Sequence, residues 1–244
     1  MSEAASTLRG DLGVLLRLLR GMPRGATHAH SLDAFYDAQS GEYDRFRERL
    51  LRGRAELVAS LPLPPHARIV ELGGGTGRNV EFLGVRLADV ASYTVVDLCE
   101  PLLARARERA QAMPQLHAVR GDATSWRPDT KVDAVILSYA LTMIPDWRAA
   151  IANATAMLKP GGVLGVVDFY ISPRRADVGT AQHGAFTRAF WPRWFAHDGV
   201  HPSAQHLPAL RAALPAHEFV EARAPVPYLP LVRVPYYRFV GVKA

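Results

Sequence analysis

Short, continuous hydrophobic runs recur along most of the chain, and helical patterns separate them. The runs, each bounded by polar or turn-forming residues, cover residues 67–72, 93–97, 116–121, 132–138 and 163–169. Between them, residues 101–113 and 146–158 repeat hydrophobic positions with the period of a helix. Runs that do not alternate with polar residues indicate strands buried on both faces. The pattern therefore predicts an α/β fold with a mostly parallel sheet under helices.

The last part of the chain departs from this alternation. Residues 170–215 are rich in Pro, His, Trp and Arg, and they interrupt the strand–helix rhythm. Two further strands are predicted near residues 218–224 and 236–242. Because only about a dozen residues without a helical period separate them, we expect the two strands to pair as an antiparallel hairpin. The prediction is therefore a sheet of seven strands.

The first thirty residues form a pattern of their own. Five leucines between residues 8 and 19 share one helical face, and arginines lie well away from it. This is typical of a basic amphipathic helix that lies in a membrane interface, and packing on the domain or on a second subunit is the alternative. Residues 31–60 then predict helices that end at Pro62. We predict an N-terminal amphipathic extension, 1–30, and one domain over 31–244 that begins with lid helices.

Composition limits the possible functions. The 244 residues suffice for one large domain, and the single cysteine, Cys99, excludes both a disulfide framework and a cysteine metal cluster. No hydrophobic run is long enough to span a bilayer, and no signal-peptide pattern appears, so we expect a cytoplasmic location. The net charge of +6 comes without a basic stripe of interleaved aromatics, so we expect no nucleic-acid partner. The oligomeric state stays open.

A glycine-rich turn follows the first predicted strand. Glu71 ends that strand, the turn 73–77 contains four glycines, and Asp97 ends the next strand. Glycines let bare peptide groups approach a ligand, and an acid at the second strand end can accept hydrogen bonds from ribose hydroxyls. Arg78 stands where a dinucleotide-binding motif has its third glycine, and no Gly-Lys-Ser/Thr follows. The turn therefore indicates a nucleoside site that does not seat a pyrophosphate, and the Glu71 carboxylate favours a cationic ligand.

The segment Glu71–Gly77 resembles motif I of the class I S-adenosylmethionine-dependent methyltransferases. The resemblance implies a Rossmann-like fold of seven strands with an antiparallel C-terminal hairpin. It implies S-adenosyl-L-methionine as cofactor, S-adenosyl-L-homocysteine as product and no metal. The glycine turn then holds the amino-acid end of the cofactor, and later strand ends hold its ribose, its adenine and its methyl group. The cofactor-binding residues that it implies are Glu71, Gly73, Gly75, Asp97, Leu98, Asp122, Ala123 and Ser138.

Several later segments together resemble the BtaB-type diacylglyceryl-homoserine N-methyltransferases of betaine-lipid synthesis. They follow residues 35–37, 43–47, 51–54 and 71–79, which share in the resemblance, and they are residues 138–145, 167–170 and 234–241. The most distinctive is the run Phe-Trp-Pro-Arg-Trp-Phe-Ala-His-Asp-Gly-Val at 190–200. The resemblance implies that an amine-bearing lipid is methylated to its trimethyl form, with peripheral contact on an anionic membrane surface. Tyr139 and Tyr43 are predicted to position the acceptor. The predicted substrate-binding residues are Tyr36, Trp191, Arg193, Trp194 and His197.

Several alternatives stay open at this point. Within the same superfamily, the chain could be a phosphatidylethanolamine, small-molecule or quinone methyltransferase. From another class, it could be a non-catalytic methyltransferase-like adaptor for a membrane or a protein partner, although the intact Glu71 and Asp97 argue against this. Asp122 could merely cap a turn. Trp191 and Trp194 could be ordinary core residues.

Overall fold

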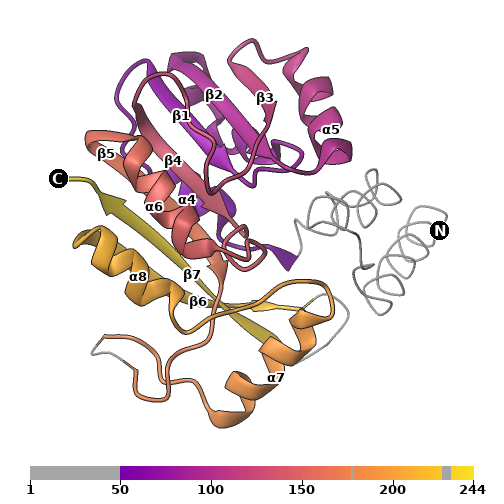
Figure 1. Cartoon of the computed structure of the whole chain (residues 1–244), viewed down its shortest axis with the longest axis vertical. Coiled ribbons are helices and arrows are strands. Elements are labelled where there is room, and N and C mark those ends of the chain that lie inside the picture. The colour runs from indigo at the N-terminus through magenta and orange to yellow at the C-terminus, as the bar shows by residue number, and fades with distance from the viewer. Residues whose placement is uncertain (1–49, 177–178, 227–231) are drawn as a thin grey trace.

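The fold is a seven-stranded sheet between two layers of helices, as Figure 1 shows. The computed structural model describes residues 50–176, 179–226 and 232–244. The strand order is β3-β2-β1-β4-β5-β7-β6. The first five strands in this order are parallel, and β7 pairs antiparallel with both β5 and β6. The strands are β1 (Ala67–Leu72), β2 (Val90–Asp97), β3 (Leu116–Arg120), β4 (Val132–Ser138), β5 (Leu158–Phe169), β6 (Ala216–Pro225) and β7 (Arg233–Val242).

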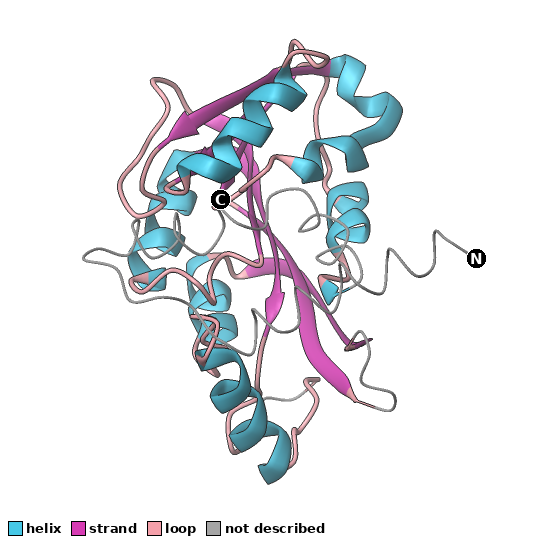
Figure 2. Cartoon of the chain, turned by 90° about the vertical axis from the view of Figure 1, so that its right-hand side faces the viewer, coloured by secondary structure: helices cyan, strands magenta, loops and turns pink. Residues whose placement is uncertain are grey.

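Helices cover both faces of this sheet, which is seen between them in Figure 2. One face carries α4 (Arg54–Ser60), the 3-10 segment η1 (Arg78–Asp89) and α5 (Glu100–Ala110). The other face carries α6 (Trp147–Met157) and α8 (His206–Ala213). The remaining helix, α7 (Ala185–Ala196), follows β5 in the chain and lies at the bottom of Figure 1.

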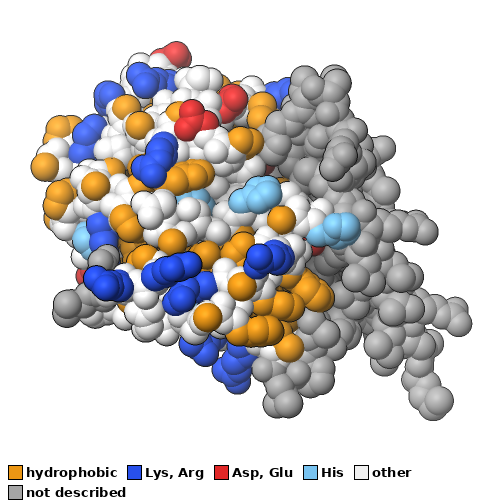
Figure 3. All heavy atoms as spheres, turned by 60° about the horizontal axis from the view of Figure 1, so that its bottom comes forward, with side chains coloured by type: hydrophobic (Ala, Val, Ile, Leu, Met, Phe, Trp, Pro, Cys, Tyr) orange, Lys and Arg blue, Asp and Glu red, His pale blue; other side chains and the backbone are white. Residues whose placement is uncertain are grey.

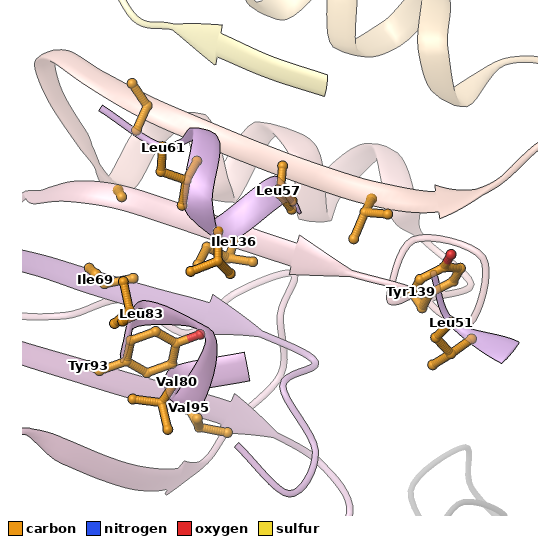
Figure 4. Packing of buried hydrophobic residues seen from close by; sticks show 14 of the residues in the cluster. Leu51, Leu57, Leu61, Ile69, Val80, Leu83, Tyr93, Val95, Ile136 and Tyr139 are labelled. Carbon is orange, nitrogen blue, oxygen red and sulfur yellow. The ribbon is translucent and has the colours of Figure 1, made fainter. Parts of the chain in front are cut away.

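The hydrophobic core explains why the strands are continuous runs. Within β1, Ile69 packs with one helix layer and Val70 with the other, and both are 1% exposed. In Figure 4, Leu57 of α4 and Leu61, which follows this helix, lie over the sheet near Ile136 of β4. Burial on both faces leaves no position for a polar stripe, so these runs read as unbroken hydrophobic sequence.

The structure confirms the predicted fold class, including all seven strands and the antiparallel C-terminal pair. Two features differ in detail. The segment after the glycine turn is a 3-10 segment with a kink at Gly84 rather than a plain α-helix. The irregular region 170–215 contains α7 and α8. Pro192 inside α7 made a helix improbable from sequence, but Trp191 and Phe195 on its inner face are buried and hold it in place.

Some predictions fall outside the described residues. These are the amphipathic extension 1–30, the first part of the lid helices at 31–49, and the residues Tyr36 and Tyr43. Within the described ranges, no helix is both long and hydrophobic enough to cross a bilayer.

Candidate functional site

A pocket of about 280 Å³ opens at the carboxyl ends of the parallel strands. This is the edge where doubly wound sheets bind their ligands. It is lined by the ends of β1 to β4 and the loops that follow them. The lining residues are Gly73, Gly75, Val96, Asp97, Leu98, Cys99, Leu102, Gly121, Asp122, Ala123, Thr124, Tyr139, Ala140, Met143, Ile144, Pro145 and Asp146.

The Asp97 carboxylate ties the glycine turn to the end of β2. Its Oδ2 accepts a hydrogen bond from the Gly75 amide at 2.8 Å, and its Oδ1 accepts one from the Cys99 amide at 2.9 Å. A carboxylate offers about four lone-pair positions. Asp97 is half-buried and lines the pocket, so it can also accept hydrogen bonds from a ligand's hydroxyls. These contacts agree with the predicted ribose-binding role.

Glu71 is fully buried beneath the turn and is held by two side-chain donors. Oε1 accepts a hydrogen bond from the Asn79 amide at 2.5 Å, and Oε2 accepts one from the Tyr93 hydroxyl at 2.7 Å. The Arg54 guanidinium in turn donates to Asn79 Oδ1 at 3.3 Å. Burying a carboxylate is costly unless it is hydrogen-bonded. The network therefore fixes a negative charge directly under the glycine turn.

A small polar cavity of about 10 Å³ adjoins this network. Arg54, Glu71, Asn79 and Ser138 line it together with the glycine turn. The Ser138 hydroxyl is buried and finds no hydrogen-bond partner in the described part of the chain. A zwitterionic amino-acid group meets cationic, anionic and hydroxyl partners here. The donor set therefore fits the methionine end of S-adenosylmethionine, while the Asp97 side of the larger pocket fits its nucleoside.

Hydrogen bonds from Thr124 and from Asn153 of α6 hold the segment that follows β3. The Asp122 carboxylate accepts hydrogen bonds from the Thr124 amide at 2.8 Å and the Thr124 hydroxyl at 2.7 Å. This is the turn-capping role that the sequence left open, and it does not remove Asp122 from the pocket wall. Asn153 of α6 donates to the carbonyl oxygens of Ala123 and Trp126, each at 2.9 Å. Asn153 thus positions this wall without lining the pocket.

The end of β4 is strained. Tyr139 has φ 53°, which is rare for a residue other than glycine and costs about 1–3 kcal/mol. Its amide donates to the Val167 carbonyl at 2.7 Å, and its hydroxyl donates to the Arg52 carbonyl at 2.6 Å. Burial raises the pKa of Tyr139 well above its usual range. Tyr139 lines the pocket, but its hydroxyl is a committed donor and cannot serve as a base at neutral pH.

The loop after Tyr139 is held by a buried carboxylate that the sequence analysis did not single out as a site residue. Asp168 of β5 accepts hydrogen bonds from the Thr142 hydroxyl at 2.7 Å and the Thr142 amide at 3.1 Å. Burial raises the pKa of Asp168 to about 7, although these hydrogen bonds oppose the shift. Since residues 143–146 line the pocket, Asp168 sets the position of one of its walls.

The predicted site residues divide into two groups. Those assigned to the cofactor come together at the four strand ends and line one or both cavities. Those assigned to the substrate on α7 do not line either cavity. Trp191 is 5% exposed and packs in the core, whereas Trp194 is 42% exposed, and Arg193 and His197 also lie at the surface. Their substrate-binding role stays a prediction.

Sequence reasoning missed Arg54, Asn79 and Tyr93, which surround Glu71. One signal was available, because an acid in the middle of a buried strand requires donors from its neighbours. Tyr93 pairs in register with Ile69, two residues before Glu71 and on the same face of the sheet. No cluster of three His, Cys, Asp or Glu side chains suited to a metal occurs among the described residues.

Comparisons with known proteins agree with this geometry. Residues 69–162 match the family described as "Methyltransferase domain". A trans-aconitate 2-methyltransferase from Variovorax paradoxus (strain S110) is 38% identical over 125 residues, which are 51% of this chain and 47% of that protein. The chain spans about half the length of the curated relatives it matches.

Solved structures share the fold at low identity. Phosphoethanolamine N-methyltransferase 2 from Haemonchus contortus, in complex with phosphomonomethylethanolamine and S-adenosylhomocysteine, superposes with a TM-score of 0.68 and 14% identity. The match covers 91% of this chain and 61% of that one. An O-methyltransferase family protein from Burkholderia thailandensis superposes with a TM-score of 0.66 and 17% identity, and the match covers 98% of this chain and 71% of that one. At such identities the likeness concerns the fold alone.

Proposed function

We propose that this chain, which carries a class I S-adenosylmethionine-dependent methyltransferase domain, methylates the amino group of a lipid head group. The favoured acceptor is diacylglyceryl-homoserine, which would be converted to its N,N,N-trimethyl form. The domain assignment comes from the family match over residues 69–162 and the seven-stranded fold. The acceptor is a proposal that comes from a resemblance in sequence and is compatible with the residues around the pocket.

The choice of an amine rests on the resemblance of residues 190–200 to the betaine-lipid enzymes, and the charge of the pocket wall is compatible with it. The lining residues include three acids, Asp97, Asp122 and Asp146, and no Arg, Lys or His among the described residues. S-adenosylmethionine, when bound, supplies a methyl group on a positively charged sulfur. A wall of this charge suits that cation. Asp97 and Asp122 belong to the cofactor side of the pocket, so the wall does not by itself distinguish an amine acceptor from a carboxylate. The chain's own contribution is to position the reactants and to exclude water.

The aromatic side chains near the methyl-transfer end support the same choice. Tyr139 lines the pocket, and its ring makes a T-shaped contact with the Phe169 ring, with centroids 4.6 Å apart. Aromatic faces stabilise quaternary ammonium groups. Because its hydroxyl is bonded to Arg52, Tyr139 would act through its ring and its fixed backbone, and water would accept the amine proton.

A second candidate is methylation of a small polycarboxylate. It is favoured by the Variovorax relative, whose name specifies trans-aconitate as its acceptor. The domain is the same in both cases, and the acceptor alone differs. The resemblance of residues 190–200 to the betaine-lipid enzymes argues for the amine.

Expression in a host that makes diacylglyceryl-homoserine tests the proposal. Lipid mass spectrometry should show this lipid gaining one to three methyl groups, and an Asp97→Ala variant expressed equally should show no gain. In parallel, the purified protein should be given labelled S-adenosylmethionine with diacylglyceryl-homoserine micelles, phosphatidylethanolamine micelles or trans-aconitate. Label in trans-aconitate alone would overturn the lipid proposal in favour of the second candidate, and label in phosphatidylethanolamine alone would change the head group.

A further inference from the structure

Helix α7 presents a second, outward face that no part of the pocket uses. Phe186, Phe190 and Trp194 recur every fourth residue and therefore form one stripe on this helix. The ring centroids of Phe186 and Phe190 are 5.2 Å apart, and those of Phe190 and Trp194 are 5.4 Å apart. Phe186 is 75% exposed and Trp194 is 42% exposed. We call these three residues the α7 aromatic stripe.

Exposed arginine side chains lie near the stripe. By helical geometry Arg193 lies on the same face, and its guanidinium is exposed while donating to the Ala189 carbonyl. Arg174 and Arg175 are also exposed, and the Arg174 carbonyl accepts a hydrogen bond from Gln182, three residues before α7. Between residues 174 and 205 the acids are Asp177 and Asp198, against four arginines, and Glu221 of β6 accepts a hydrogen bond from the Ala181 amide. In Figure 3, where the bottom of Figure 1 faces forward, hydrophobic side chains gather beside Lys and Arg side chains.

A chain of aromatic contacts joins this outer face to the pocket. Behind Phe190, the ring of Trp191 lies 5.1 Å away, and Trp191 stacks on Phe195 at 5.3 Å. Phe195 stacks on Phe169 at 4.7 Å, and Phe169 meets Tyr139 of the pocket wall at 4.6 Å. The inner face of α7 is therefore part of the packing that supports the pocket. A partner bound to the outer face would lie close behind the methyl-transfer site.

We propose that the outer face of α7 docks on an anionic lipid membrane, with the α7 aromatic stripe entering the interface and the nearby arginines contacting lipid phosphates. Phe and Trp on one face with arginines beside them is the composition of membrane-surface helices. An acidic protein would also satisfy the charges. However, Phe186 and Trp194 protrude from one helix face, and such exposed side chains suit a fluid surface better than a shaped protein pocket. The proposal concerns a binding surface and does not depend on which acceptor is methylated.

Vesicle flotation with the full chain tests the proposal without cofactor or acceptor. Vesicles of phosphatidylcholine with one quarter phosphatidylglycerol contain no primary amine, so the result is independent of the methylation assay. Wild-type protein should float with these vesicles and much less with pure phosphatidylcholine. A Phe186→Ser and Trp194→Ser double variant should bind about tenfold more weakly or worse, because each side chain loses its burial in the interface. Arg193→Gln should lower the affinity for the anionic vesicles about fivefold and leave the affinity for pure phosphatidylcholine unchanged.

Val85→Ser is the matched control, since Val85 is 93% exposed but lies on η1. It should bind like wild type, and circular dichroism should show that all variants are folded. Absence of binding by wild type, equal loss in Val85→Ser, or full binding by the double variant would each overturn the proposal. A fourth outcome would also overturn the proposal: wild type is a dimer in sedimentation equilibrium, the double variant is a monomer, and neither binds vesicles. The stripe would then face a second copy of the chain.

Discussion

Removing the Tyr93 hydroxyl should destabilise the protein although Tyr93 does not line either cavity. Tyr93 is fully buried, and its hydroxyl donates to Glu71 Oε2 at 2.7 Å. Burial, together with the nearby Glu71 carboxylate, raises the pKa of Tyr93 well above its usual range, so it remains a donor at every accessible pH. Tyr93→Phe removes a single oxygen atom, leaves the ring in the core and deprives a buried carboxylate of a side-chain donor.

The expected loss follows from the nature of that bond. A hydrogen bond to a charged group contributes about 1.5–3 kcal/mol to the free energy of unfolding. No water replaces the lost donor when the remaining partner is buried, so the whole contribution should be lost. In a domain of this size each kcal/mol shifts the Tm by about 2–4 °C, so the variant should melt about 3–12 °C below wild type. Tyr237→Phe is a matched control. Tyr237 is equally buried, but its hydroxyl finds no hydrogen-bond partner in the described part of the chain, so its removal should be neutral or stabilising.

Urea unfolding and calorimetry should be measured for wild type, Tyr93→Phe and Tyr237→Phe. A cycle with Glu71→Gln isolates the pair, and the coupling free energy should be about 1.5–3 kcal/mol. If Tyr93→Phe lies within 0.5 kcal/mol of wild type, about the scatter of a neutral substitution, the hydrogen-bonded carboxylate under the glycine turn is wrong. Equal destabilisation by the two tyrosine variants would also contradict the reasoning.

Three further predictions address the other walls of the pocket. Gly73→Ala should cost more stability than Gly161→Ala in urea unfolding, because a Cβ at Gly73 would lie 2.8 Å from that of Ala140, whereas at Gly161, which also has positive φ, it meets open space. Equal losses would exclude the close approach. Asn153 does not line the pocket, yet Asn153→Ala should weaken S-adenosylhomocysteine binding severalfold in calorimetry, because Asn153 holds the pocket wall in position. Unchanged affinity would refute this positioning role. Burial raises the pKa of Asp168 to about 7, against about 3.9 unfolded, so this group makes stability fall by up to about 4 kcal/mol as the pH rises from about 4 to about 7. In Asp168→Asn the free energy of unfolding should no longer fall over this pH range. An unchanged pH dependence would mean that another group causes it.

The fold and the cofactor side of the site were predictable from local sequence. Hydrophobic runs that do not alternate with polar residues marked strands such as β1 and β4 to the residue, since a strand buried on both faces has few polar positions. Glu71, the glycine turn and Asp97 lie at consecutive strand ends, and parallel strands bring those ends together. Here the chain order alone determines which residues meet.

The supporting residues were not predictable in the same way. Asp168 contacts Thr142 across 26 positions in the sequence, and no local pattern links the two residues. Tyr139 looked like an acceptor-positioning residue, but only the three-dimensional arrangement shows that its hydroxyl is bonded to Arg52. Helix α7 was hidden by Pro192, because its stability comes from aromatic packing on Phe169 rather than from helix propensity.

Binding of S-adenosylhomocysteine to the purified chain, measured by isothermal titration calorimetry, tests the central claim most directly. The account predicts one molar equivalent bound by wild type and at least about tenfold weaker binding by Asp97→Ala, which removes an acceptor from both Gly75 and the ligand. Absence of binding by folded wild-type protein, or equal affinity in the two proteins, would contradict the assignment of this pocket.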